Sequence, residues 1–183
     1  TTEEVQRLEA HCAEAKRAPL RLLAMVRLAL DLGLRVGEIA KLEIGDFDWR
    51  AGTVTLKRTK SQRQDVLPLP VLTGQALAEY MRHERPATTL PSLFVRRLAP
   101  HDKPIGVDAV SQAIGRALRG AGISRGCHSL RHTLACRLVN SGSSIKEVAD
   151  VLRHRSLDTS LIYAKLDLQL LAEVALPWPG SAS

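Results

Sequence analysis

The residues best suited to chemistry lie near the carboxyl end of the chain. The run His128-Ser129-Leu130-Arg131-His132 is followed by Leu152-Arg153-His154 and then by Tyr163, one of two tyrosines. Arginine binds phosphate through a planar fork of donors, and histidine exchanges protons near neutral pH. A phenol surrounded by cations and imidazoles can attack a phosphodiester once its proton is removed. This grouping therefore points to phosphoryl transfer with a tyrosine nucleophile.

Each of these residues also has a plainer interpretation. A lone tyrosine such as Tyr163 is usually part of a core or an interface, and Tyr80, on an apolar helical stripe, is predicted to be core. An isolated arginine such as Arg35 is usually a surface residue. His128 and His132 have the i, i+4 spacing of a zinc pair on a helix, but Arg131 would place a cation beside the metal and no carboxylate lies between them.

The composition favours a polyanionic partner. The chain has 183 residues, a net charge of +7 and a pI of about 9.8, and lysines and arginines displace counterions from nucleic-acid phosphates. Aromatic residues make up only 3%, which disfavours base-stacking platforms. Three widely spaced cysteines without a CxxC motif predict neither disulfides nor structural zinc. No signal peptide or long apolar run is present, so we expect a cytoplasmic, nucleoid-associated protein without a membrane partner.

The periodicity predicts a mostly helical α+β fold with a small three-stranded antiparallel sheet. Val54-Thr55-Leu56 and Val66-Leu67 are typical of strands, joined by a basic turn over 57–63; a strand is also expected over 44–49. We expect helices from Thr1, where Glu4 completes a capping box, and after Pro19, with a stripe of Leu22, Leu23, Val26 and Leu30. Further helices are expected over 37–42, 72–84, 107–120, 129–140, 144–152, 158–164 and 166–174.

The boxes of this chain resemble, in order and spacing, the catalytic domain of the tyrosine recombinases, or phage integrase family. Gly33-Leu34-Arg35-Val36-Gly37-Glu38 matches the family's first arginine box, and His128-Ser129-Leu130-Arg131 matches the second. His154, Thr159 and Tyr163 match the pattern His-x4-Thr-x3-Tyr. The likeness covers residues 2 to 176, which predicts a catalytic domain over 1–176 and a tail over 177–183.

The resemblance implies a role for each matched residue. Arg35 and Arg131 would bind the phosphate, His128 would accept the tyrosine proton, His154 would donate a hydrogen bond to the phosphate, and Tyr163 would be the nucleophile. Glu38 would be structural and orient Arg35, and His132 would be structural. The family's usual glycine before the last histidine is Arg153 here, at a position where glycine can adopt a positive φ.

The basic turn would supply the general acid for the leaving 5′-oxygen. Lys60 is eight residues before Pro68, the family spacing, and we choose it over Lys57; a solvated hairpin is the plainer interpretation. Further DNA contacts are assigned to four basic residues, Lys57, Arg58, Arg63 and Arg153.

By resemblance, the chain is a site-specific DNA recombinase that forms a 3′-phosphotyrosine intermediate without metal or cofactor. Its partner would be double-stranded DNA. The apolar segment 166–174 would pack either on its own domain or on a neighbouring subunit, and through the second contact the chain would form a homotetramer on DNA. A type IB topoisomerase and a non-catalytic DNA-binding protein of the same fold are the alternatives. Because the chain starts near the catalytic fold, we expect either a fragment or a naturally short recombinase.

Overall fold

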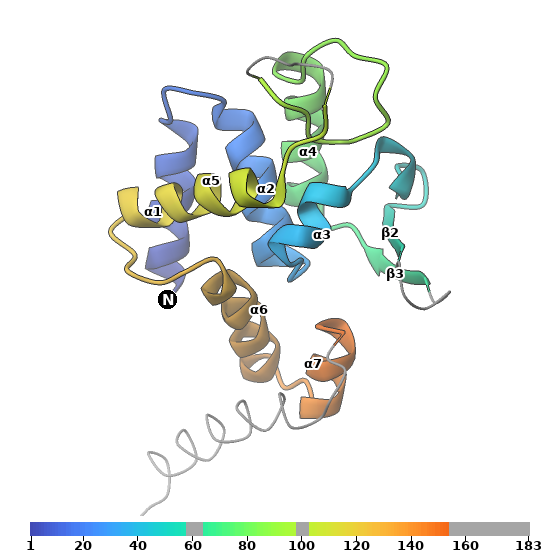
Figure 1. The fold of residues 1–183 in the computed structure, drawn as a ribbon. Coiled ribbons are helices and arrows are strands. Elements are labelled where there is room, and N and C mark those ends of the chain that lie inside the picture. Colours follow the sequence, from blue (N-terminus) through green and yellow to red (C-terminus); the bar gives the residue numbers. More distant parts are fainter. Residues whose placement is uncertain (58–63, 98–102, 154–183) are drawn as a thin grey trace, which may run out of the picture. The chain divides into compact units, whose positions relative to one another are not determined.

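The computed structural model describes residues 1–57, 64–97 and 103–153 (Figure 1). The chain divides into two compact units, Thr1–Thr133 and Leu134–Ser183. The first unit holds the helices α1 to α5, the small sheet and the start of α6. The described part of the second unit is the rest of α6 and the helix α7.

The first two helices begin as their sequences predict. Helix α1 spans Thr2–Ala13, and the Thr1 hydroxyl accepts the Glu4 backbone N–H at 3.2 Å while the Glu4 carboxylate accepts the Thr1 amine, the predicted capping box. Helix α2 spans Pro19–Asp31 with proline in its first turn. Its first amides donate to a distant side chain, because the Glu84 carboxylate accepts the N–H groups of Leu20 and Arg21.

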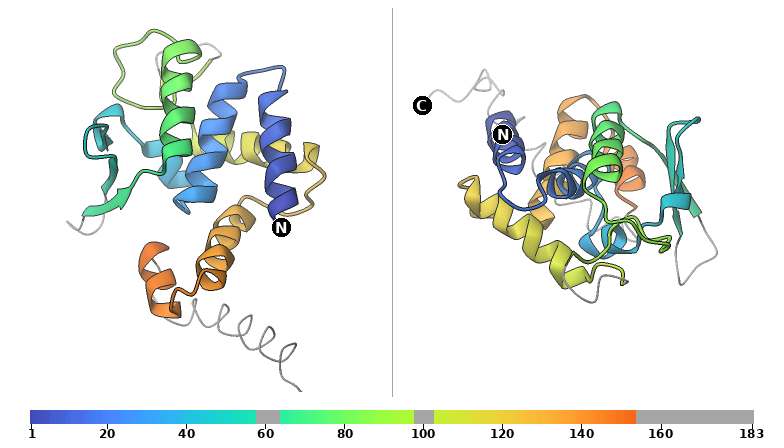
Figure 2. Two further views of the ribbon diagram at one scale, coloured as in Figure 1. Left: turned by 180° about the vertical axis from the view of Figure 1, so that it is seen from behind. Right: turned by 90° about the horizontal axis from the view of Figure 1, so that it is seen from above.

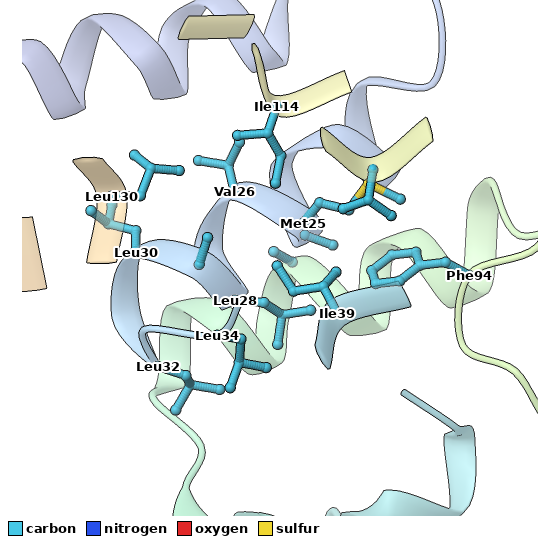
Figure 3. Packing of buried hydrophobic residues seen from close by; sticks show 14 of the residues in the cluster. Met25, Val26, Leu28, Leu30, Leu32, Leu34, Ile39, Phe94, Ile114 and Leu130 are labelled. Atoms are coloured by element: carbon cyan, nitrogen blue, oxygen red, sulfur yellow. The ribbon is translucent and has the colours of Figure 1, made fainter. Parts of the chain in front are cut away.

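Helix α2 is the centre of the core of the first unit. It packs against α1, α3 (Val36–Lys41), α4 (Val71–His83) and α5 (Val107–Gly120), and α2 and α4 lie side by side in Figures 1 and 2. Figure 3 shows Met25, Val26, Leu28 and Leu30 of α2 packed among core residues from other elements, including Ile39, Phe94 and Ile114. The apolar stripe predicted for this helix is narrower than the surface that the structure buries. Met25 and Leu28 are fully buried while Leu22 and Leu23 are only partly buried, because a helix covered on several sides has no single apolar face.

The sheet has the order β1-β2-β3 and is antiparallel, as predicted. Strand β1 is Phe47–Asp48, β2 is Thr53–Lys57 and β3 is Gln64–Pro68. The register pairs Val54 with Leu67 and Lys57 with Gln64. Extending the first strand back to residue 44 was wrong, because Ile44–Asp46 forms a 3-10 turn, in which the Glu43 carbonyl accepts the Asp46 N–H.

The remaining helices follow the predicted ranges closely. Helix α5 packs against α1, α2 and α3 (Figure 1), and its first residue, Val107, is exposed. Tyr80 of α4 is fully buried, as predicted. Helix α6 spans His128–Asn140. Helix α7 spans Ile145–Val151, and the Ser144 hydroxyl caps it. The helices expected over 158–164 and 166–174, and the boundary at residue 176, lie outside the described residues.

Candidate DNA-cleavage site

The first arginine box is a helix start held by its own glutamate. Gly33, two residues after the last residue of α2, has φ +59°, a conformation that suits glycine. Arg35 is the N-cap of α3. The Glu38 carboxylate accepts the Arg35 backbone N–H at 2.8 Å and the Arg35 guanidinium at 3.2 Å. Glu38 therefore contacts Arg35 directly, and its orienting role stays a prediction. The Arg35 side chain remains 44% exposed.

The second arginine box reaches back to the first. Arg131, on the first turns of α6, is only 6% exposed, and its Nη1 donates to the Gly33 carbonyl across 98 residues of sequence. Because Gly33 is two residues before Arg35 in the chain, this bond fixes the first turn of α6 beside the box that holds the first arginine. His128, the first residue of α6, is exposed, and His132 is half-buried. Nothing in the sequence singled out the Gly33 carbonyl as the acceptor.

The basic turn is described only at its first residue. Lys57 ends β2, and its Nζ lies 2.8 Å from Asp46 Oδ1 and 3.1 Å from Glu43 Oε2. Neither carboxylate was identified in the sequence, because the pairing depends on how the 3-10 turn packs against β2. Lys60, Arg58 and Arg63 lie outside the described residues, so their roles stay predictions.

Arg153, at the position where the family has glycine, lies just after the end of α7. Arg153 has φ +54°, so this position adopts the left-handed conformation even though it is not glycine. Its backbone N–H donates to the Asp150 carbonyl at 3.0 Å, and its side chain is 7% exposed. A DNA contact by Arg153 stays a prediction. His154 and Tyr163 lie outside the described residues.

Within its first unit the described chain therefore places two arginines and a histidine at neighbouring helix starts. Arg35 and Arg131 offer the bidentate donors that a phosphate needs, and His128 offers an exposed imidazole. Across the described ranges, no three histidine, cysteine or carboxylate side chains gather as metal ligands would, so the zinc pair of His128 and His132 gains no further ligand there. No helix in the same ranges is long and apolar enough to cross a bilayer.

Solved structures of known recombinases share this fold. The XerA recombinase superposes with a TM-score of 0.79 at 25% identity, over 95% of this chain and 62% of that one. The XerH site-specific recombinase, bound to a palindromic difH substrate in a post-cleavage complex, also gives 0.79 at 25% identity, over 96% of this chain and 52% of that one. The fold is thus the catalytic fold of the tyrosine recombinases.

Sequence relatives agree with the structural neighbours. A putative integrase/recombinase of Sinorhizobium fredii, y4rF, is 40% identical over 90% of this chain, which spans 40% of that protein. A second one from the same organism, y4gC, is 38% identical, and the match spans 90% of this chain and 86% of that protein. The tyrosine recombinase XerA of Pyrococcus furiosus is 29% identical over 94% of this chain and 59% of its own length.

The model of the phage integrase family matches residues 1–169. The chain belongs to the phage integrase family. It spans about two fifths of the first two relatives' length.

Proposed function

We propose that this chain is the catalytic part of a site-specific DNA recombinase that cuts and rejoins strands through Tyr163. The observation that supports this most directly is the bond from the buried Arg131 guanidinium to the Gly33 carbonyl, next to Arg35. Two arginine boxes far apart in sequence are thereby fixed at one place, as two ligands of one phosphate would have to be. Family membership and the recombinase fold support the same reaction.

In the proposed reaction the phenolic oxygen of Tyr163 attacks the phosphorus and its proton passes to His128. The phosphorus–oxygen bond to the 5′-oxygen breaks, and that oxygen takes a proton from Lys60. Arg35 and Arg131 stabilise the negative charge that accumulates on the non-bridging oxygens, and His154 adds a hydrogen bond. The 3′-phosphotyrosine retains the energy of the broken bond, so a 5′-hydroxyl can reverse the steps and rejoin the strand without ATP.

We propose that the chemistry proceeds without a metal, because two guanidinium groups and a lysine can provide the charge stabilisation that a divalent cation would otherwise supply. We also propose that the partner is duplex DNA, bound with strong salt dependence, and that the protein forms a tetramer on DNA through segment 166–174. The solved XerH structure contains the palindromic difH substrate, which supports a DNA partner here.

The deciding experiment is covalent trapping in EDTA. The protein is incubated with nicked duplexes drawn from the DNA that flanks its own gene, and an SDS-resistant adduct is sought. Tyr163→Phe must abolish the adduct. Tyr80→Phe is the matched control, because the other tyrosine is a buried core residue whose hydroxyl donates to the Leu93 carbonyl at 3.3 Å, and it must leave the adduct in place.

Other outcomes separate the alternatives. Relaxation of supercoiled plasmid by a monomer, with no strand exchange, would indicate a topoisomerase. DNA binding that Tyr163→Phe leaves unchanged, with no adduct on any duplex, would indicate a non-catalytic DNA-binding protein. Light scattering with and without DNA measures the proposed assembly.

A further inference from the structure

The cluster formed by Lys57, Glu43 and Asp46 connects the sheet to the arginine box. Lys57 is the last residue of β2, while both carboxylates belong to the segment that directly follows α3, the helix that Arg35 begins. The Lys57 ammonium lies 2.8 Å from Asp46 Oδ1 and 3.1 Å from Glu43 Oε2. A strand end is thus joined to the element that positions the first arginine.

The two carboxylates are held by the backbone around them. The second oxygen of Asp46 accepts the Glu43 N–H at 2.8 Å, and the Asp46 N–H donates to the Glu43 carbonyl at 3.1 Å. Glu43 also forms a β-bridge with Ser92. Asp46 is nearly buried, whereas Lys57 is 58% exposed. The carboxylates therefore form the fixed side of the cluster, and the long lysine side chain is the part that adapts.

Lys57 stands at the point where the hairpin leaves the sheet. The pair Lys57–Gln64 is the last one in the β2–β3 register before residues 58–63, which include the proposed general acid. The pKa of Lys57 is raised, first by its hydrogen bond to Asp46 and then by that to Glu43. An ammonium held this way is a poor proton donor.

We propose that Lys57 is a positioning residue. It anchors the end of β2, where the basic turn begins, to the segment 42–46 that follows α3, and it makes no contact with a DNA phosphate. This inference rests on the proposed recombinase function, in which Lys60 must protonate the leaving oxygen. The charge balance supports it: one positive and two negative charges leave the cluster at −1. A phosphate would be repelled by that net charge, so Lys57 contributes nothing to counterion release.

A charge-balanced double variant tests the phosphate contact. Lys57→Met with Glu43→Gln removes one positive and one negative charge and keeps the cluster at −1. Binding to a short duplex of arbitrary sequence is measured against salt concentration. The proposal expects an unchanged slope of log K against log salt. A slope lower by about 0.9, the value of one phosphate contact, would overturn it. Lys41→Met, at the exposed end of α3, is the matched single-lysine control.

A second measurement tests the positioning role. The trapping duplex is prepared with an ordinary 5′-oxygen and with a 5′-bridging sulfur, which leaves as a thiolate and needs no proton donor. The double variant is expected to form adduct about tenfold more slowly on the oxygen duplex, part of the roughly 10²- to 10⁴-fold that a general acid supplies. On the sulfur duplex it should match the unaltered protein. Equal loss on both duplexes, or loss on neither, would overturn the proposal.

The outcome also separates this inference from the proposed function. If the unaltered protein forms no adduct on either duplex, the recombinase reaction fails. Whether Lys57 anchors the sheet is then tested by amide hydrogen exchange in strands β2 (53–57) and β3 (64–68). Faster exchange in the double variant at these strands would support the anchoring by Lys57, and unchanged exchange would overturn it. Lys41→Met should leave both the rates and the exchange unaltered.

Discussion

Replacing Arg153 by alanine and by glycine gives two variants that should differ in stability in a predictable direction. Arg153 follows the end of α7 with φ +54°, a conformation in which the Cβ of any residue but glycine is crowded. Helices commonly end on a glycine in this conformation. Neither alanine nor glycine has the arginine side chain, so the loss of its buried contacts is the same in both variants.

The magnitude follows from two opposing terms. The left-handed conformation costs a residue with a Cβ about 1–2 kcal/mol. Glycine loses more chain entropy on folding, which offsets about 0.4–1 kcal/mol. We therefore expect Arg153→Gly to be more stable than Arg153→Ala by about 1 kcal/mol. For a chain of 183 residues this corresponds to a difference in Tm of about 2–4 °C.

Circular dichroism of thermal and urea unfolding measures this difference directly. The two variants should unfold with equal urea m-values and different midpoints, because only the stability is changed. Equal midpoints, or a higher midpoint for the alanine variant, would refute the strain at this helix end. Leu152 is the neighbouring control position: its φ of −78° is ordinary, so glycine there should bring no such gain over alanine.

Three further predictions concern other parts of the chain. Burial raises the pKa of the Cys12 thiol from 9.0 to about 12. The contribution of this thiol to stability is therefore full below pH 9 and is lost as the pH rises through 12. Between pH 9 and 10 the free energy of unfolding in urea should fall by up to about 1.4 kcal/mol per pH unit, and Cys12→Ala should remove this dependence. Glu38→Gln should slow adduct formation about tenfold by misaligning Arg35. It should change the free energy of unfolding by less than about 0.5 kcal/mol, because the ion pair is partly exposed. An unchanged rate of adduct formation would argue against the orienting role. Ser144→Ala should lower the free energy of unfolding in urea by about 1 kcal/mol by removing the cap on the Glu147 N–H, while Ser144→Asp should retain it.

Much of the fold was accessible from local pattern. The capping residues Thr1 and Ser144, the proline that opens α2 and the glycine that ends it act within one or two helical turns, so their effect can be read along the chain. The sequence marked Arg153 as a departure from the family's glycine, and only the structure showed that its backbone keeps a positive φ. The 3-10 turn at Ile44 and the breadth of the buried face of α2 were not foreseen, since both depend on what packs against them.

The candidate site also combines features that the local sequence shows with features that depend on packing. The sequence determined which residues could act on a phosphate, because arginine, histidine and tyrosine are recognisable by type and by spacing within a box. Only the tertiary structure decided that Arg131 meets the Gly33 carbonyl and that Lys57 meets Glu43 and Asp46. Each of these contacts joins segments that periodicity treats separately. Their geometry depends on contacts between segments that are far apart in the sequence, and the spacing of residues along the chain does not indicate which segments will meet.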